Sequence, residues 1–484
     1  MADLFIRKPL QQLMTEAEES GTHTLKRVLG PWQLVALGIG AVIGAGIFVL
    51  TGEAAYKNAG PAVVLSFVAS GIACAFAGLC YAEFASLIPI AGSAYTYGYA
   101  TLGELFAWII GWDLILEYAL GASTVSVGWT GHFVPLLRHF GINIPASIST
   151  STFIIDNQGQ FVNTGCFNVL SFLVLIAISM ILAIGIKESA TVNSIIVFLK
   201  LSIVLIFIAC GIWYVKPENW QPFIPPSEGW LHYGWSGILG GGALVFFAYI
   251  GFDAVSTAAQ ETRNPKRDLP IGILGSLAIC TVLYIVVSAI LTGLVSYKQL
   301  GVMAPIVVGI QATPFRWLAW VVELGAVLGL ASVMLVMLLG QSRVFYSMSK
   351  DGLLPEVFSR VHPRFRTPHI ITMLTGVVVA IVAGLLPIRV LATMVNIGTL
   401  LAFVIVSASV IVLRIKRPDL PRPFKTPGYP VVPALGVLTS LGLMAFLPLD
   451  TWLRLGIWLL IGLLIYFLYG MRHSKVRAAA GGRQ

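Results

Sequence analysis

The sequence predicts an all-α integral membrane protein, and its composition gives the first reason. Of the 484 residues, 57% are hydrophobic and only 11% are charged, whereas a soluble globular chain carries about 25% charged residues. A surface so poor in charge cannot dissolve in water, so we interpret the length as one large helical bundle rather than several soluble domains. Two apolar segments broken by glycine give the second reason, and they are described below.

Twelve segments are long and apolar enough to cross a bilayer, each near the ~20 residues that its hydrocarbon core requires. The third and the eighth exceed this length, so we expect them to tilt or to extend beyond the membrane. The polar loop at 136–164, with Asp156, Asn157, Gln158 and Gly159, is expected to be an ordered external excursion. The predicted spans are 32–54, 61–88, 104–135, 165–186, 190–214, 235–260, 270–296, 317–348, 369–387, 390–413, 431–448 and 451–470.

Lys and Arg residues fall mainly on one side of these spans. With the N-terminus inside, Lys200 lies within a span and most of the 30 residues fall in inner loops and tails, while the outer side holds only Lys57, Arg138, Lys216, Lys298, Arg316, Arg389 and Arg454. Basic loops stay cytoplasmic, so we expect a cell-membrane protein with both termini in the cytoplasm. The net charge of +9 then needs no nucleic-acid partner, because basic loops lie beside an anionic leaflet. For the basic run at 414–418, a topology anchor is favoured over a lipid-headgroup site.

Two apolar segments contain glycines where a spanning helix would cross the middle of the membrane. Residues 37–48 read LGIGAVIGAGIF, and residues 240–253 read GGGALVFFAYIGFD. A helix that breaks there strands N–H and C=O groups, which is tolerated only where they line a cavity or bind a ligand. Two such breaks about five helices apart indicate a substrate site between the inverted repeats of a secondary transporter. Close helix packing is the alternative for a glycine-rich span, and it is favoured for Gly38 and Gly40 alone.

The ends of the broken helices predict which chemical groups such a site binds. At Gly44, Ala45 and Gly46 the downstream half-helix presents free N–H groups and a partial positive charge, which suit a carboxylate. Near residues 247–251 the upstream half-helix presents free carbonyls, which suit an ammonium group. Together these ends recognise the head group that all α-amino acids share, so an L-amino acid is the expected substrate.

Ionisable side chains inside the membrane are costly, so each is a candidate for function. Glu117 lies about 13 residues into its span, ~20 Å deep and near the middle of a ~30 Å core. Lys200 is also near mid-depth, where it can act as a proton carrier or as a fixed cation in place of sodium. Asp253 follows the second break. For Glu83 and Asp113, nearer the membrane faces, a polar group satisfied inside the bundle is the favoured interpretation.

Other classes of protein find little support in the sequence. The five cysteines lie in or beside apolar segments without metal-ligand spacing, and we interpret them as small buried residues. The seven histidines are scattered, and neither a nucleophile motif nor a channel filter occurs, so we expect no cofactor, no metal and no enzymatic activity.

Several ordered motifs together resemble those of the amino acid–polyamine–organocation transporters, and more narrowly those of the cationic amino acid transporter branch. They extend over nearly the whole chain, which makes the likeness far more specific than a lone glycine motif. The motifs are GIGAVIGAGIFVLTG at 38–52, YAE at 81–83, GWDLILEY at 111–118, GFDAVST at 251–257, NPKRDLP at 264–270, QSRV at 341–344 and SKDGLLP at 349–355.

The resemblance implies a fold of twelve transmembrane helices with a five-plus-five inverted-repeat core, discontinuous helices 1 and 6, and alternating access to a central site. The first repeat is expected at 32–214 and the second at 235–413, followed by two extra helices at 431–470. Residues 1–31 and 471–484 would form cytoplasmic tails.

The resemblance also assigns residues to the site. Gly44, Ala45 and Gly46 would hold the substrate carboxylate, and carbonyls of Phe247, Ala248 and Ile250 its ammonium, with the Phe247 ring as a gate. Lys200 matches the lysine that stands at the sodium position in proton-coupled relatives, so proton-coupled uptake without sodium is expected. Positions at or near the side-chain pocket would be Val42, Ile43, Glu117, Gly121, Asp253 and Met337.

Two pocket positions point to different substrates. Met337 is bulky and apolar, which suits a small neutral side chain such as that of alanine, whereas Glu117 can attract arginine or lysine. An amino acid exchanger is the alternative mechanism, and a non-transporting amino-acid receptor is the alternative from another class, disfavoured by the short tails. Expected partners are the L-amino acid, protons and membrane lipid, and a small single-helix membrane subunit stays open.

Overall fold

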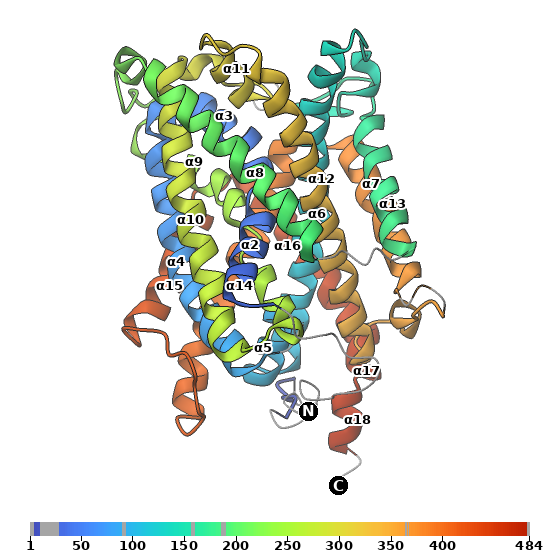
Figure 1. Ribbon diagram of the computed structural model, residues 1–484. Coiled ribbons are helices and arrows are strands. Elements are labelled where there is room, and N and C mark those ends of the chain that lie inside the picture. Colours follow the sequence, from blue (N-terminus) through green and yellow to red (C-terminus); the bar gives the residue numbers. More distant parts are fainter. Residues whose placement is uncertain are drawn as a thin grey trace.

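The computed structural model is mostly helical, and it describes residues 4–9, 29–89, 93–155, 160–184, 190–363, 365 and 367–481. Within these residues, eight helices are long and apolar enough to cross a membrane, and four shorter apolar helices accompany them. Figure 1 shows them side by side in one bundle. They lie where the sequence predicts spans, while the count of twelve crossings stays a prediction.

The first part of the chain, up to the second break, consists of α2 (Pro31–Val42), η1 (Gly46–Leu50), α3 (Thr51–Ala54), η2 (Ala55–Ala59), η3 (Gly60–Ala62), α4 (Val63–Leu87), α5 (Ser93–Thr101), α6 (Glu104–His139), η4 (Ala146–Ile148), β1 (Phe153–Ile155), β2 (Phe161–Asn163), α7 (Val169–Ile184), α8 (Ala190–Gly211), η5 (Ile212–Tyr214), η6 (Pro217–Trp220) and α9 (Gly234–Val245).

The second part consists of η7 (Phe246–Tyr249), η8 (Asp253–Glu261), α10 (Pro265–Leu294), η9 (Tyr297–Gln299), α11 (Pro305–Gln311), α12 (Leu318–Lys350), η10 (Glu356–Ser359), α13 (His369–Leu385), α14 (Ile388–Lys416), α15 (Val431–Ala445), α16 (Leu449–Ile465), η11 (Tyr466–Gly470), α17 (Met471–His473) and α18 (Lys475–Gly481).

Local sequence explains where several of these helices begin. Pro31, Pro265 and Pro305 each occupy the first position of a helix, where a missing N–H group costs nothing and the fixed φ angle suits the helix. Gly103 precedes α6 with a φ of +105°, a left-handed conformation that favours glycine. The 36 residues of α6 and the 33 of α12 exceed what a bilayer core needs, as the sequence predicts.

The helices divide into a buried centre and an exposed periphery. In the helical stretch Gly234–Ala259, 89% of the most apolar 18-residue segment is buried inside the protein. In the stretch Leu449–Ala479 the corresponding share is 22%. The long helix α6 packs against both α12 and α14, and α10 packs against α2 and α4. The broken segments therefore lie inside the bundle, where stranded backbone groups can be satisfied by protein.

The loop after α6 corrects the all-α expectation. β1 and β2 pair antiparallel, with Phe153 opposite Asn163, and this hairpin lies at the end of the bundle opposite the two termini (Figure 1). The loop is ordered on both sides of residues 156–159, which lie outside the described residues together with most of the 1–31 tail. Cys166 and Cys210 are also less buried than expected, since both are partly exposed.

Glu83 is satisfied inside the bundle, as its favoured interpretation predicts. Arg414 binds its carboxylate through two nitrogens, at 3.0 and 2.6 Å, and the Thr426 N–H donates to the same group at 2.8 Å. Arg422 adds an ion pair at 3.3 Å. Arg414 is thus occupied by Glu83 and holds α14 against α4.

Candidate substrate site

The first break exposes the N-terminal end of a half-helix. α2 ends at Val42, and Ile43 adopts an extended conformation with φ −72° and ψ 101°. Within the described residues, the backbone N–H groups of Gly44, Ala45 and Gly46 donate to no other protein group. Three free donors at the start of a helix are an arrangement that suits an anion, and helix geometry alone creates it.

The second break lies directly against the first. η7 is followed by Ile250 in an extended conformation and by Gly251 with a φ of +115°. A methyl group added to Gly46 would overlap the Cα and Cβ atoms of Ala248, and one added to Gly251 would lie 3.0 Å from the Ala41 carbonyl. The absence of side chains at these glycines is therefore what lets the two broken segments touch.

Lys200 binds the carbonyl end of α2. Its Nζ donates to Gly40 O at 2.8 Å and to Ile43 O at 3.2 Å, and the residue is 1% exposed. The end of a helix carries a partial negative charge and unpaired carbonyls, so the lysine satisfies groups that the break would otherwise strand. Its stem lies beside Gly329, where a methyl group would come within 3.1 Å of it.

Two polar side chains that sequence reasoning missed hold the breaks from other helices. The Tyr284 hydroxyl, on α10, lies 2.9 Å from both Val42 O and Ala248 O, one carbonyl from each break. Asn396, on α14, donates through Nδ2 to Ala243 O and Leu244 O at 2.7 and 2.9 Å. Sequence analysis could have selected Tyr284 and Asn396, because a polar residue in an apolar span is a candidate for function.

Acidic side chains gather beside the breaks. Glu117 and Asp253 interact electrostatically with each other, and both are 2% exposed. Glu117 Oε1, Asp253 Oδ2 and both carboxylate oxygens of Asp113 have no hydrogen-bond partner among the described residues. Asp113 therefore lacks the protein partner that its favoured interpretation requires. Buried polar atoms without partners are costly, so this cluster suits water or a polar ligand.

Met337 and Gly121 meet across α12 and α6. A methyl group on Gly121 would lie 3.4 Å from the Met337 sulfur, so the thioether fills the space above the glycine. All of the predicted site residues are buried. Two groups of these residues lie together, through direct contact or through a shared hydrogen-bond partner. One group is the two breaks with Lys200, and the other is Gly121 with Met337. The roles of individual residues in binding stay predictions.

Comparison with known proteins places the chain in a family. Residues 29–468 match the model of the amino acid permease family. The chain belongs to this family. It is 51% identical over 474 residues to the branched-chain amino acid permease BcaP of Bacillus subtilis, covering 98% of this chain and 99% of that protein. It is 45% identical to a methylthioribose transporter of the same organism, with the same coverage.

Plant relatives share less of their length with this chain. The vacuolar cationic amino acid transporter 4 of Arabidopsis thaliana is 39% identical over 404 residues, which are 83% of this chain and 66% of that protein. The predicted resemblance is thereby confirmed, and this amino acid permease is a multi-pass membrane protein whose relatives are transporters rather than enzymes.

Proposed function

We propose that this permease carries L-amino acids across the cell membrane by proton-coupled symport with alternating access. The free N–H groups of Gly44, Ala45 and Gly46 would bind the substrate carboxylate. Carbonyls of Phe247, Ala248 and Ile250 would bind its ammonium group, and the buried Phe247 ring would close over it. Both ends of the head group are thus met by backbone atoms, which makes its recognition independent of the substrate side chain.

The position of Lys200 is the observation that carries the coupling proposal. Its ammonium group donates to Gly40 O and Ile43 O, and unwound carbonyls of this kind coordinate the coupling ion in secondary transporters. Because the lysine occupies these oxygens, a sodium ion would have to compete with a covalently attached cation. A proton leaving Lys200 would remove the charge and weaken both bonds, which would link protonation to the geometry of the first break.

The residues predicted to surround the substrate side chain favour neutral substrates first. Val42, Ile43, Gly121 and Met337 offer apolar surface to a small alkyl group such as that of alanine, and the name of the relative BcaP adds branched aliphatic amino acids to the candidates. Glu117 and Asp253 leave buried acceptors unpaired, which would favour an arginine or lysine side chain that reaches them. Transport of cationic amino acids is therefore the second candidate activity.

We further propose the membrane arrangement that the basic loops indicate. Both termini would be cytoplasmic, with inverted repeats at 32–214 and 235–413, helices at 431–470 and tails at 1–31 and 471–484. The two termini lie at the same end of the bundle (Figure 1), which this arrangement requires. Apolar side chains exposed on α8, such as Phe198 at 68%, would face lipid or a single-helix subunit.

Uptake of radiolabelled alanine and leucine into proteoliposomes, with and without an inward proton gradient, tests this proposal. The wild type should accumulate substrate only with the gradient and without sodium. Lys200→Ala should abolish gradient-driven uptake, and Lys200→Gln, which keeps an N–H donor near Gly40 O, should fold but stay uncoupled. Lys298→Ala, at an exposed lysine of an outer loop, is the matched control and should transport normally.

Other results would redirect the assignment. Uptake that needs preloaded amino acid and ignores pH would make the protein an exchanger and leave Lys200 a structural cation. Binding without any flux would identify a receptor. Because one relative is named a methylthioribose transporter, methylthioribose should be included as a competitor, and its failure to inhibit would support an amino-acid substrate.

A further inference from the structure

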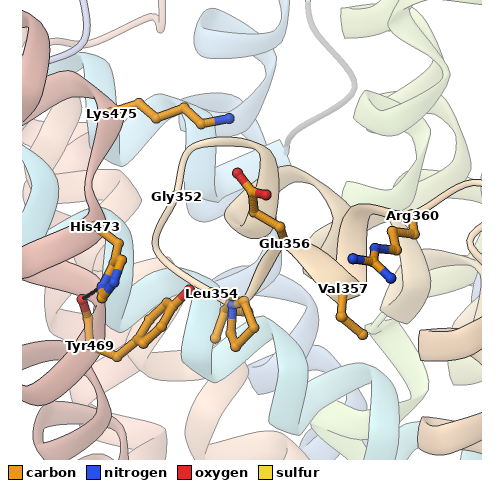
Figure 2. Close-up of a pocket in the computed structure, with 9 residues that line it drawn as sticks. Gly352, Leu354, Glu356, Val357, Arg360, Tyr469, His473 and Lys475 are labelled. Carbon is orange, nitrogen blue, oxygen red and sulfur yellow. Dashed lines mark hydrogen bonds between the residues drawn. The ribbon is translucent and has the colours of Figure 1, made fainter.

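A cavity that the candidate substrate site does not include lies at the end of the bundle that holds both termini (Figure 1). It measures about 350 Å³ and is bounded by the segment after α12 and by the last turns of the chain. Figure 2 shows Lys475 and Arg360 extending toward it from opposite sides, with Glu356 between them. The other lining residues are Gly352, Leu354, Pro355, Val357, Tyr469 and His473.

The charges around this cavity favour an anion. Arg360 and Lys475 carry two positive charges against the single negative charge of Glu356. Within the described part of the chain, neither cation forms an ion pair with a carboxylate. His473 donates from Nδ1 to the Tyr469 carbonyl at 2.9 Å, since a carbonyl can only accept.

Buried contacts hold the two walls of the cavity together. Lys475 N donates to Asp351 O at 3.1 Å, and the Gly352 Cα approaches the His473 carbonyl so closely that no side chain fits between them. Below this contact, Glu104, with 0% exposure, accepts bonds from Tyr466 and Arg477. Lys475 is therefore presented by an anchored segment rather than by a loose tail, and Arg360 directly follows η10, which packs against α12.

The surroundings of the cavity indicate where its ligand comes from. It lies at the end of α16, which belongs to the least buried of the long apolar helical stretches described. Along α16 and η11 a row of large apolar side chains at helical spacing is exposed, at Ile457, Ile461, Leu464 and Leu468. Tyr469 follows directly, where the headgroup region of a bilayer is typically met by tyrosine and tryptophan.

We propose that this cavity binds a phosphate ester, supplied by the headgroup of an anionic lipid from the adjacent leaflet. Arg360 and Lys475 would donate charge-assisted hydrogen bonds to the phosphate oxygens from two sides. The acyl chains would lie along the exposed row on α16, which a free phosphate compound could not use. The lipid would bridge the segment after α12 and the C-terminal turns, two parts of the chain that meet at this cavity.

Thermal unfolding of the purified full-length protein, followed by tryptophan fluorescence, tests this assignment. Short-chain phosphatidylglycerol should raise the melting temperature with a saturable dependence. Short-chain phosphatidylcholine, whose phosphate is balanced by its own ammonium group, and glycerol 3-phosphate, which lacks acyl chains, should each bind about tenfold more weakly. Equal affinity for glycerol 3-phosphate and phosphatidylglycerol would keep the phosphate site but make a free phosphate ester its ligand.

Variants separate this site from general surface charge. The double variant Arg360→Gln/Lys475→Gln should weaken phosphatidylglycerol binding at least about tenfold, while Lys416→Gln/Lys425→Gln, at two exposed lysines on the same side, should change it by less than about twofold. Glu356→Gln removes the only carboxylate among the described residues that line the cavity and should tighten binding, a gain that misfolding cannot imitate. Identical titrations for the two double variants, or a wild type that does not distinguish the two lipids, would overturn the proposal.

Discussion

A methyl group at Gly46 is the smallest change that tests the contact between the two breaks. In Gly46→Ala the new carbon would lie 2.9 Å from Ala248 N and closer still to its Cα and Cβ. These atoms belong to a backbone that other helices hold in place, so the two segments must separate. Overpacking of this kind costs about 1–3 kcal/mol. If this cost destabilises the substrate-bound state relative to the free state, substrate affinity falls roughly 5- to 150-fold.

The assay is amino-acid binding to purified protein, measured by the shift in melting temperature and by competition against radiolabelled substrate. Gly442→Ala is the matched control, because it adds the same methyl group where no atom lies within 4 Å. Adding Ala248→Gly to Gly46→Ala removes one of the overlapping atoms but leaves the Cα, so it should restore affinity only in part.

One result would refute this reasoning. If Gly46→Ala folds and binds substrate like the wild type, the two broken segments can separate at no cost, and their close approach is not required for binding. An equally large loss of affinity in Gly442→Ala would also refute the reasoning, because the loss could then not be attributed to the overlap with Ala248.

Three further predictions concern other contacts. Tyr284→Phe removes the hydroxyl shared by the two breaks and should cost about 1–3 kcal/mol of stability, measured by denaturant unfolding in detergent. Glu83→Gln breaks two ion pairs and leaves Arg414 and Arg422 uncompensated, so it should lower stability by about 3–5 kcal/mol. Partial restoration by an added Arg414→Gln would confirm the pair with Arg414, because Arg422 stays unpaired. Met337→Ser should raise arginine uptake relative to alanine uptake in proteoliposomes, and an unchanged ratio would remove this methionine from the pocket.

Sequence reasoning located the breaks because their cause is local. Glycine at 44, 46 and 251 and the small residues around them weaken a helix by themselves, and the structure leaves the helix at Ile43 and again after Val245. The burial of Lys200 and Glu117 was equally predictable, since a charge in an apolar span must face the interior of the bundle.

The partners of these groups depend on packing between distant parts of the chain. Tyr284 is 242 residues from Val42, and Asn396 is 153 residues from Ala243, so no local pattern marks either pair. The bond between Glu104 and Arg477 spans 373 residues and joins a C-terminal turn that sequence alone assigned to a tail. The hairpin at 153–163 was missed because two three-residue strands are too short to show periodicity.

The Tyr284 hydroxyl has one proton and two acceptors at equal distance. It can donate to the carbonyl of only one break at a time, so the other carbonyl receives no hydrogen bond from this hydroxyl. Moving the proton from one acceptor to the other needs only a rotation about the C–O bond, and the number of hydrogen bonds does not change. Under the alternating access proposed above, such a switch would let one broken helix move past the other without an intermediate in which both are released. Tyr284 would then allow the two broken helices to move relative to each other rather than fix them in one position.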